Sequence, residues 1–133
     1  MGDTMKYVAL TGISENVIKE LRNNVLLSIE IRNPKNFFSA LKLNPGESVF
    51  LTSTSSEDVR KGTLGVISKV LKHQVSTHRL VQSNDMYYEE RETTLIRLQL
   101  QPNCLGRVNK PYDNSIEQPT YVEAEILTCY DAR

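Results

Sequence analysis

The chain has 133 residues, of which 16 are basic and 16 acidic, so its formal net charge at pH 7 is zero. Hydrophobic residues make up 39% and charged residues 24%, a composition that is typical of a globular protein and excludes a disordered chain. The balanced charge excludes binding of nucleic acid through bulk charge, although a local basic face remains open. We expect one domain over residues 1–133, with residues 1–4 as a short disordered extension.

Membrane spans, secretory signals and cysteine-based sites are absent from the sequence. The longest aliphatic run is Val25-Leu26-Leu27, far short of the roughly 20 apolar residues that a membrane span requires. We therefore expect a cytoplasmic protein with no membrane partner. The two cysteines, Cys104 and Cys129, form no C-x-x-C pair, and we expect both to be reduced.

The first third of the chain predicts two strands separated by a helix. Lys6–Leu10 is the first strand candidate, and Ser14 then provides a side chain that can cap a helix. Asn23-Asn24 ends that helix. Apolar and polar residues alternate over Val25–Arg32, the period of two that marks a half-buried strand.

A second helix is predicted directly after this strand. Asn33-Pro34 is typical of a helix start, because asparagine caps the first turn and proline fits the first helical position. We expect Phe37, Phe38 and Leu41 of this helix to face the core, together with Phe50 from the strand that follows. Asn44–Glu47, which contains Pro45 and Gly46, predicts a tight turn.

The rest of the chain is expected to be mostly strand. The predicted strands are Ser48–Ser53, Gly62 to about Gln74, Met86–Gln101 and Thr120–Cys129, with one helical turn over Ser55–Lys61. Pro102–Pro119 has no periodic pattern and predicts a long irregular segment. Two early helices followed by four strands indicate an α+β fold, and closure of about six strands into a small barrel would remove exposed edges.

The segment from about Val25 to Val70 resembles the ASCH branch of the PUA-like superfamily. Three stretches carry the resemblance: Glu30-Ile31-Arg32 at the end of an early strand, the turn Gly46-Glu47, and the later strand Gly62–Ile67. Members of this branch are small β-barrels with two early helices, and many are implicated in RNA binding. The chain as a whole also resembles a family of uncharacterised archaeal proteins.

The resemblance implies a PUA/ASCH-like β-barrel of about six strands with two short helices in its N-terminal half. It also implies RNA binding near the Glu-x-Arg motif. The lysine that the branch often carries ahead of this motif is absent from Asn23–Arg32. The amidohydrolase chemistry linked to that lysine is therefore not carried over to this chain.

Basic residues near and beyond this motif suggest a local basic cleft. Arg60–Arg79 contains five lysines or arginines, two histidines and no acidic residue. Such a window can contact phosphates without net charge on the whole protein, although cross-strand pairing with acidic strands would explain it equally well. The residues predicted to bind RNA are Glu30, Arg32, Lys35, Arg60, Lys61 and Lys69. Tyr87, Tyr88, Tyr112 and Tyr130 are candidates for stacking on bases.

The leading hypothesis is therefore an RNA-binding module without catalysis. One alternative is a hydrolase acting on nucleosides or RNA through Glu30, Glu90 or a histidine; another is a protein-interaction domain. No metal-ligand spacing and no glycine-rich phosphate loop occurs, so we expect neither a metal nor a cofactor. The identity of the RNA and the oligomeric state stay open.

Overall fold

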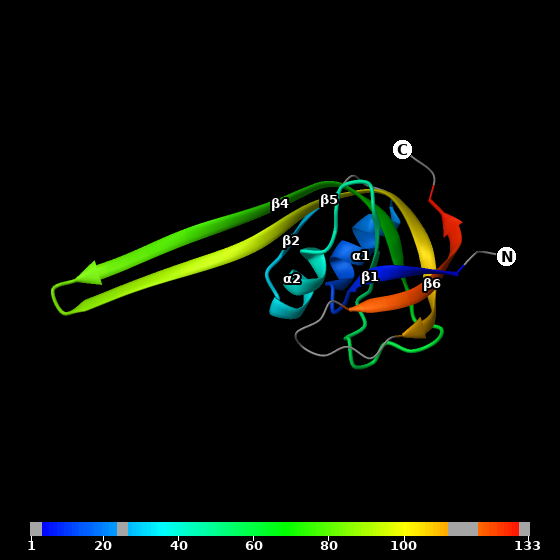
Figure 1. The fold of residues 1–133 in the computed structure, drawn as a ribbon, viewed down its shortest axis with the longest axis horizontal. Helices are drawn as coiled ribbons and strands as arrows, with labels where there is room; N and C mark the ends of the chain where they lie inside the picture. Colours follow the sequence, from blue (N-terminus) through cyan, green and yellow to red (C-terminus); the bar gives the residue numbers. More distant parts are fainter. Residues whose placement is uncertain (1–3, 24–26, 112–119, 131–133) are drawn as a thin grey trace.

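The computed structural model describes residues 4–23, 27–111 and 120–130. The order of elements is the one that the sequence predicts, a run of alternating strands and helices followed by strands (Figure 1). The elements are β1 (Thr4–Leu10), α1 (Glu15–Arg22), β2 (Leu27–Ile31), α2 (Pro34–Ala40), β3 (Ser48–Leu51), β4 (Leu64–Asn84), β5 (Tyr87–Pro111) and β6 (Tyr121–Cys129). The fold is thus α+β with two short helices. None of the helices in these ranges has the length and apolar character needed to cross a membrane.

Both helices begin at the predicted caps. The Ser14 hydroxyl accepts a hydrogen bond from the backbone N–H of Val17, and the Asn33 side chain accepts from the N–H groups of Lys35 and Asn36. These bonds satisfy donors that have no partner within the first helical turn. The prediction that α2 buries all its large apolar residues is wrong, because Phe38 and Leu41 are 46% and 44% exposed.

Five of the six strands pair in a closed ring. The sheet order is β2-β5-β4-β3-β1-β6, and β5 also pairs with β6, so the ring runs β1, β3, β4, β5, β6 and back to β1. β2 lies outside the ring and pairs with β5 over Leu27–Ile31. The β1–β3 pairing is parallel and the others are antiparallel. Thr4, expected in a disordered extension, instead pairs with Glu125 as the first residue of β1.

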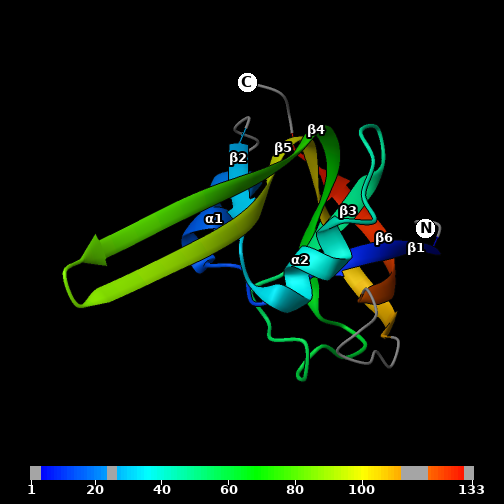
Figure 2. The ribbon, with the colours of Figure 1, turned by 60° about the vertical axis from the view of Figure 1, so that its left-hand side comes forward.

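The strands of the ring bury a different set of side chains on each face. One cluster takes residues from all five ring strands, so it fills the inside of the ring: Tyr7, Ala9, Phe50, Ile67, Val108, Val122 and Ala124. The other cluster joins α1 and α2 to β2 and to the opposite strand face, through residues such as Ile18, Ala40, Ile31 and Leu98. Strand alternation therefore separates an interior core from a core beneath the helices. The two helices lie outside the ring in the ribbon of Figure 2.

Two facing glycines allow the ring to close. Gly65 of β4 pairs with Gly106 of β5. A Cβ atom at Gly65 would lie 2.5 Å from the backbone oxygen of Leu51 and 2.5 Å from the Phe50 ring, and one at Gly106 would lie 2.6 Å from the Ile67 side chain. A bulge in the β5–β6 pairing lies beside Gly106. Only glycine lets the strands approach this closely.

β4 and β5 are much longer than predicted. β4 continues ten residues past Gln74, and β5 includes Pro102–Pro111, for which an irregular segment was expected; residues 112–119 lie outside the described ranges. The outer parts of the two strands form a hairpin that projects from the body (Figure 1). Ser55–Lys61 contains a hydrogen-bonded turn, in which Ser55 Oγ contacts Asp58 Oδ2 at 2.9 Å, and no helix.

The expectation of two reduced cysteines is also wrong. Cys104 and Cys129 face each other across the β5–β6 pairing and form a disulfide. Sequence spacing gave no sign of it, because a separation of 25 positions matches no cysteine motif. The bond links β5 and β6, the pair that closes the ring.

The glycine pair generates a stability prediction. Gly65→Ala should lower the free energy of unfolding by about 1–3 kcal/mol, the usual cost of overpacking, because backbone and a buried ring both stand in the way. Gly12→Asn is the matched control: Gly12 has φ +63° and nothing within 4 Å of a Cβ, and asparagine tolerates this conformation. Denaturant unfolding measures both, and equal loss in the two variants would contradict close packing at Gly65.

Candidate functional site

A hollow of about 470 Å³ lies where the two helices begin. Five consecutive residues, Ser28–Arg32, line this hollow. Consecutive residues of a strand point to opposite faces, so a hollow that touches all five lies at the edge of β2. That edge is open, because among the described strands β2 pairs with β5 alone. The remaining wall comes from the start of α1 and the start of α2: Gly12, Ile13, Ser14, Val17, Asn33 and Asn36.

Two charged residues, Glu30 and Arg32, line this hollow, and Glu30 also contacts Arg97 of the neighbouring strand β5, which is not among the lining residues. The Glu30 carboxylate accepts a hydrogen bond from Arg32 Nη2 at 3.0 Å through one oxygen and from Arg97 Nη2 at 2.9 Å through the other. Glu30 and Arg97 are opposite each other in the β2–β5 register, so the strand pairing places them together. The hydrogen bond from Arg97, and after it that from Arg32, lowers the pKa of the Glu30 carboxyl group below its ordinary value. The cluster carries a net charge of +1 near neutral pH.

The wall of the hollow is held by a buried amide. Asn36 of α2 is buried, its Nδ2 donates to the backbone oxygen of Thr11 at 2.8 Å, and its Oδ1 accepts from the Thr11 N–H at 3.1 Å. Both bonds join α2 to the end of β1, directly before Gly12. Ser39, one turn further along α2, accepts a hydrogen bond from the Thr120 N–H at 2.9 Å. The helix that forms one side of the hollow is therefore fixed to two ring strands.

The structure brings together only part of the predicted RNA site. Glu30 and Arg32 line the hollow, and Lys35 lies in the first turn of α2, two residues after Asn33. Arg60 and Lys61 come just before the start of β4. Arg32 follows Ile31 of β2, and Ile31 and Val75 of β4 both pair with Ile96 of β5. Arg32 therefore lies near the level of Val75 in the sheet. Because Val75 lies eleven positions beyond Leu64, the path along β4 between the two groups is about 36 Å.

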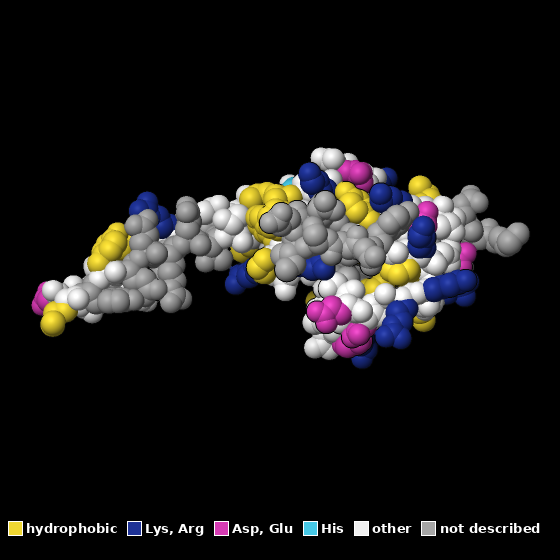
Figure 3. Space-filling view, turned by 60° about the horizontal axis from the view of Figure 1, so that its bottom comes forward, with side chains coloured by type: hydrophobic (Ala, Val, Ile, Leu, Met, Phe, Trp, Pro, Cys, Tyr) yellow, Lys and Arg dark blue, Asp and Glu magenta, His cyan; other side chains and the backbone are white. Residues whose placement is uncertain are grey.

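The other basic residues of the predicted window are similarly dispersed. Lys69 lies opposite Ser48 at the far end of the short strand β3. Arg107, which lies outside this window, is paired with Glu125 across β5 and β6. On the face in Figure 3, basic side chains are spread over the body without forming one patch. The cross-strand explanation of the basic residues thus applies to Arg107 at least.

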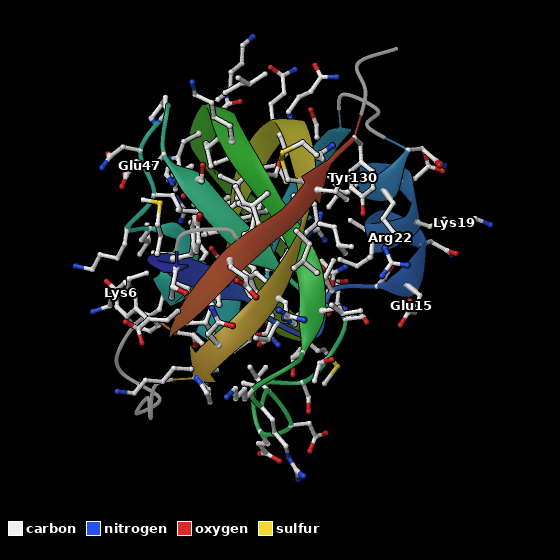
Figure 4. All side chains as sticks on the ribbon, turned by 90° about the vertical axis from the view of Figure 1, so that its right-hand side faces the viewer. Lys6, Glu15, Lys19, Arg22, Glu47 and Tyr130 are labelled. Carbon is white, nitrogen blue, oxygen red and sulfur yellow. A yellow bond between two sulfur atoms is a disulfide. The ribbon has the colours of Figure 1, made fainter. Side chains whose placement is uncertain are left out.

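The histidine and tyrosine candidates lie away from the hollow. His73 Nε2 donates to the backbone oxygen of Ala40 at 2.9 Å and so connects β4 to the C-terminal end of α2. Tyr88 is on the projecting hairpin and is 64% exposed. Tyr130 follows β6, on the side of the molecule where α1 lies (Figure 4). The side chains of His78, Tyr87 and Glu90, and all of Tyr112, lie outside the described part.

Arg97 is absent from the residues predicted to bind RNA, although it begins a second acid-free stretch, Arg97–Tyr112, that adds to the basic residues of the sequence. Alternation over Met86–Gln101 places Arg97 on the polar face of its strand, but pairing partners depend on register. The sequence shows an arginine on the polar face of one strand and a Glu-x-Arg motif on another. Only the register between β2 and β5 shows that Arg97 is paired with Glu30.

These features define an α+β protein with a closed ring of strands and an open-edged hollow beside its helices. The chain belongs to the family described as "Protein of unknown function (DUF473)", which it matches over residues 5–122. It is similar to the uncharacterized protein MJ0105 of Methanocaldococcus jannaschii, with 37% identity over 100 residues, or 75% of this chain and 62% of the relative. The expectation of an uncharacterised archaeal family is thus confirmed. No solved structure matches the chain.

The charge cluster predicts an unusually acidic Glu30. Because its pKa is lower in the folded protein, the two ion pairs contribute stability at every pH above the unfolded-chain value, and this contribution is lost as the pH falls through the lower folded-state pKa. A carbon-13 NMR titration of the carboxyl group should give a pKa below 4.5. Arg97→Gln should raise it more than Arg32→Gln, and the opposite order would contradict the assigned causes.

Proposed function

We propose that this protein binds single-stranded RNA without catalysis, holding one nucleotide in the hollow between β2 and the starts of the two helices. The observation that carries the proposal is the pairing of Arg32, which lines the hollow, and Arg97, from the neighbouring strand β5, on the Glu30 carboxylate. An arginine has five N–H donors. The Glu30 bonds use one Nη2 donor of each guanidinium and leave others for phosphate oxygens.

The hollow fits a nucleotide in size and chemistry. About 470 Å³ lies within the range of small-molecule sites, which are mostly apolar with a few polar groups. Ile13 and Val17 provide apolar wall against which a base can lie, and the hydroxyl and amide caps Ser14 and Asn33 border it. The open edge of β2 adds backbone donors and acceptors that can pair with the edge of a base.

The finer assignment of the fold to the PUA-like superfamily, ASCH branch, is part of the same proposal. It is supported by the ring of strands, by the two early helices and by the position of the Glu30-Ile31-Arg32 motif at the hollow. A small ring of strands with RNA bound at its side is the arrangement that the resemblance implies. The proposed site is narrower than the sequence suggested, because Arg60, Lys61 and Lys69 lie elsewhere.

Catalysis by Glu30 is disfavoured by its surroundings. A general acid or base works best with a pKa near the operating pH, which for a carboxyl group requires a raised value. The two arginines lower it instead and keep Glu30 ionised. His73, another candidate, uses Nε2 in its bond to Ala40. The arrangement suits positioning of the two guanidinium groups.

The RNA proposal predicts which cations matter. Fluorescence anisotropy with a labelled single-stranded RNA of about ten nucleotides should show binding that weakens from about 50 to 200 mM salt. Arg32→Gln and Arg97→Gln should each raise Kd about tenfold at low salt, as expected for loss of one charged hydrogen-bonding group, and reduce the salt slope by about one.

The matched control is the double variant Arg60→Gln/Lys61→Gln, which removes two positive charges far from the hollow. It should change Kd less than threefold, roughly the effect of long-range charge at this ionic strength. Circular dichroism verifies that each variant is folded. Absence of binding at 50 mM salt, or a larger loss in the control than in Arg32→Gln, would rule out RNA binding at this hollow.

A further inference from the structure

The outer parts of β4 and β5 form an arm that pairs only with itself. We define the arm as Val75–Leu95, in which Ser76 pairs with Leu95 at the base and Asn84 with Tyr87 at the tip. β3 pairs with β4 only up to Lys69, and β2 pairs with β5 only from Ile96 inward. Nine residues of strand make the arm about 30 Å long. It projects from the body in both ribbon views (Figure 1, Figure 2).

A free arm of this kind has little stability of its own. A two-stranded hairpin in water is marginal unless a third strand or another surface covers it. Within the described chain nothing pairs with either arm edge between Ser76 and Thr94. Unpaired strand edges and exposed apolar residues favour association with another surface.

Among the described side chains of the arm, the exposed Val75, Val81 and Tyr88 share one face, which also carries Arg79, while Met86 at the tip is 95% exposed. Val75, Val81 and Ser83 are separated by even numbers of positions on β4, so their side chains point to the same face of the arm. Tyr88 of β5 is paired with Ser83 and points to that face as well. Val75 and Val81 are each 49% exposed, and Tyr88 is 64% exposed. The same face continues inward to Ile96 and Leu98, which are buried under the helices. The face of β4 and β5 that packs against the helices near the body therefore continues along the arm, where no helix of the described chain covers it.

A second apolar surface lies at the root of the arm. Phe38 of α2, which sequence analysis expected in the core, is 46% exposed there. It lines a hollow of about 260 Å³ together with Arg32, Pro34, Phe37 and Thr94. Thr94 pairs with Thr77 on the apolar arm face, so the hollow adjoins this face at its base. In Figure 3, apolar side chains gather where the arm leaves the body and again further along it.

We infer that the arm is a dimerisation element and that its partner is a second copy of this chain. The two copies are related by a two-fold axis and their arms run antiparallel. The Val81–Tyr88 patch of each arm then covers the root of the other, with an apolar arm side chain entering the hollow lined by Phe37 and Phe38. Such an isologous contact needs two complementary surfaces on one chain, here arm and root. It is independent of the proposed RNA site.

The charge of the arm disfavours a nucleic acid as its partner. The arm sequence contains two arginines against one aspartate and three glutamates, a net charge of −2. A polyanion would meet repulsion along this segment, since nucleic-acid affinity depends mainly on neutralising phosphates. Thr77 and Thr94, with hydroxyl oxygens 3.4 Å apart, lie on this face at the base of the arm, and Arg79 lies between Thr77 and Val81.

The surface available is large enough for a dimer. One arm face is about 30 Å long and about 10 Å wide, or about 300 Å². If two arms and two roots of this size are covered, the dimer buries on the order of 1,200 Å² in total, which is the lower limit for specific stable interfaces. We expect a dimer in the micromolar range and not an obligate one.

Sedimentation velocity over about 1 to 100 μM measures this equilibrium. The wild-type chain should shift from monomer to dimer, and Val81→Glu and Phe38→Glu should each weaken dimerisation at least tenfold. Gln82→Glu is the matched control, because it adds the same charge one residue away on the opposite strand face and should leave the dimer unchanged. Circular dichroism and thermal unfolding of the monomer test whether each variant is folded.

Disulfide trapping tests the geometry. Both native cysteines are already joined to each other. Mixing Val81→Cys protein with Phe38→Cys protein should therefore give a cross-linked pair. Within one chain Val81 is four residues beyond Thr77 and so about 13 Å from the root, outside disulfide reach. Gln82→Cys mixed with Phe38→Cys should cross-link at least tenfold more slowly.

Several results would overturn the proposal. A wild-type monomer at 100 μM would do so, as would a dimer that survives both Val81→Glu and Phe38→Glu in folded proteins. A monomer whose RNA affinity falls in Val81→Glu but not in Gln82→Glu would assign the arm to RNA. Loss of RNA binding in Arg32→Gln with dimerisation intact would leave the present proposal standing, since the two sites are tested by separate readouts.

Discussion

The pairing of β5 with three other strands is the constraint on which the structure depends. Its inner part pairs with β6 and closes the ring, its middle part pairs with β2, and its outer part pairs with β4 alone. The inner part therefore borders the core inside the ring, the middle part borders the core under the helices, and the outer part forms the exposed arm. One strand of 25 residues fixes the position of the site and of the arm relative to the ring.

The charge cluster and the hollow follow from the middle part. Glu30 and Arg97 come from strands 67 residues apart in sequence and meet because their register makes them direct neighbours. A shift of one residue would turn Arg97 to the opposite face and break the cluster. Since β2 has no further strand partner among the described strands, its edge stays open beside the two helix starts. An ionised carboxylate that orients two guanidinium groups is a binding arrangement and not an acid–base one.

Local patterns in the sequence predicted the elements well, and long-range pairings not at all. The caps at Ser14 and Asn33, the alternation around Ile29 and the order of strands and helices were all correctly predicted, since each depends on neighbours within a few residues. The extension of β5 through Pro102–Pro111 and the Cys104–Cys129 disulfide were missed. Glycine and proline suggested a loop there, whereas pairing with two strands keeps the segment extended.

The sequence by itself determined that this is an α+β protein with two capped helices, about six strands and a Glu-x-Arg motif at the end of the second strand. Only the tertiary structure decided which cations share a surface: Arg97 joins Glu30 and Arg32, while Arg60 and Lys61 lie far along β4. It also decided that Phe38 is exposed at the root of an arm. The physical reason is that capping and periodicity act over a few residues, whereas register, ring closure and burial depend on strands brought together from distant parts of the chain.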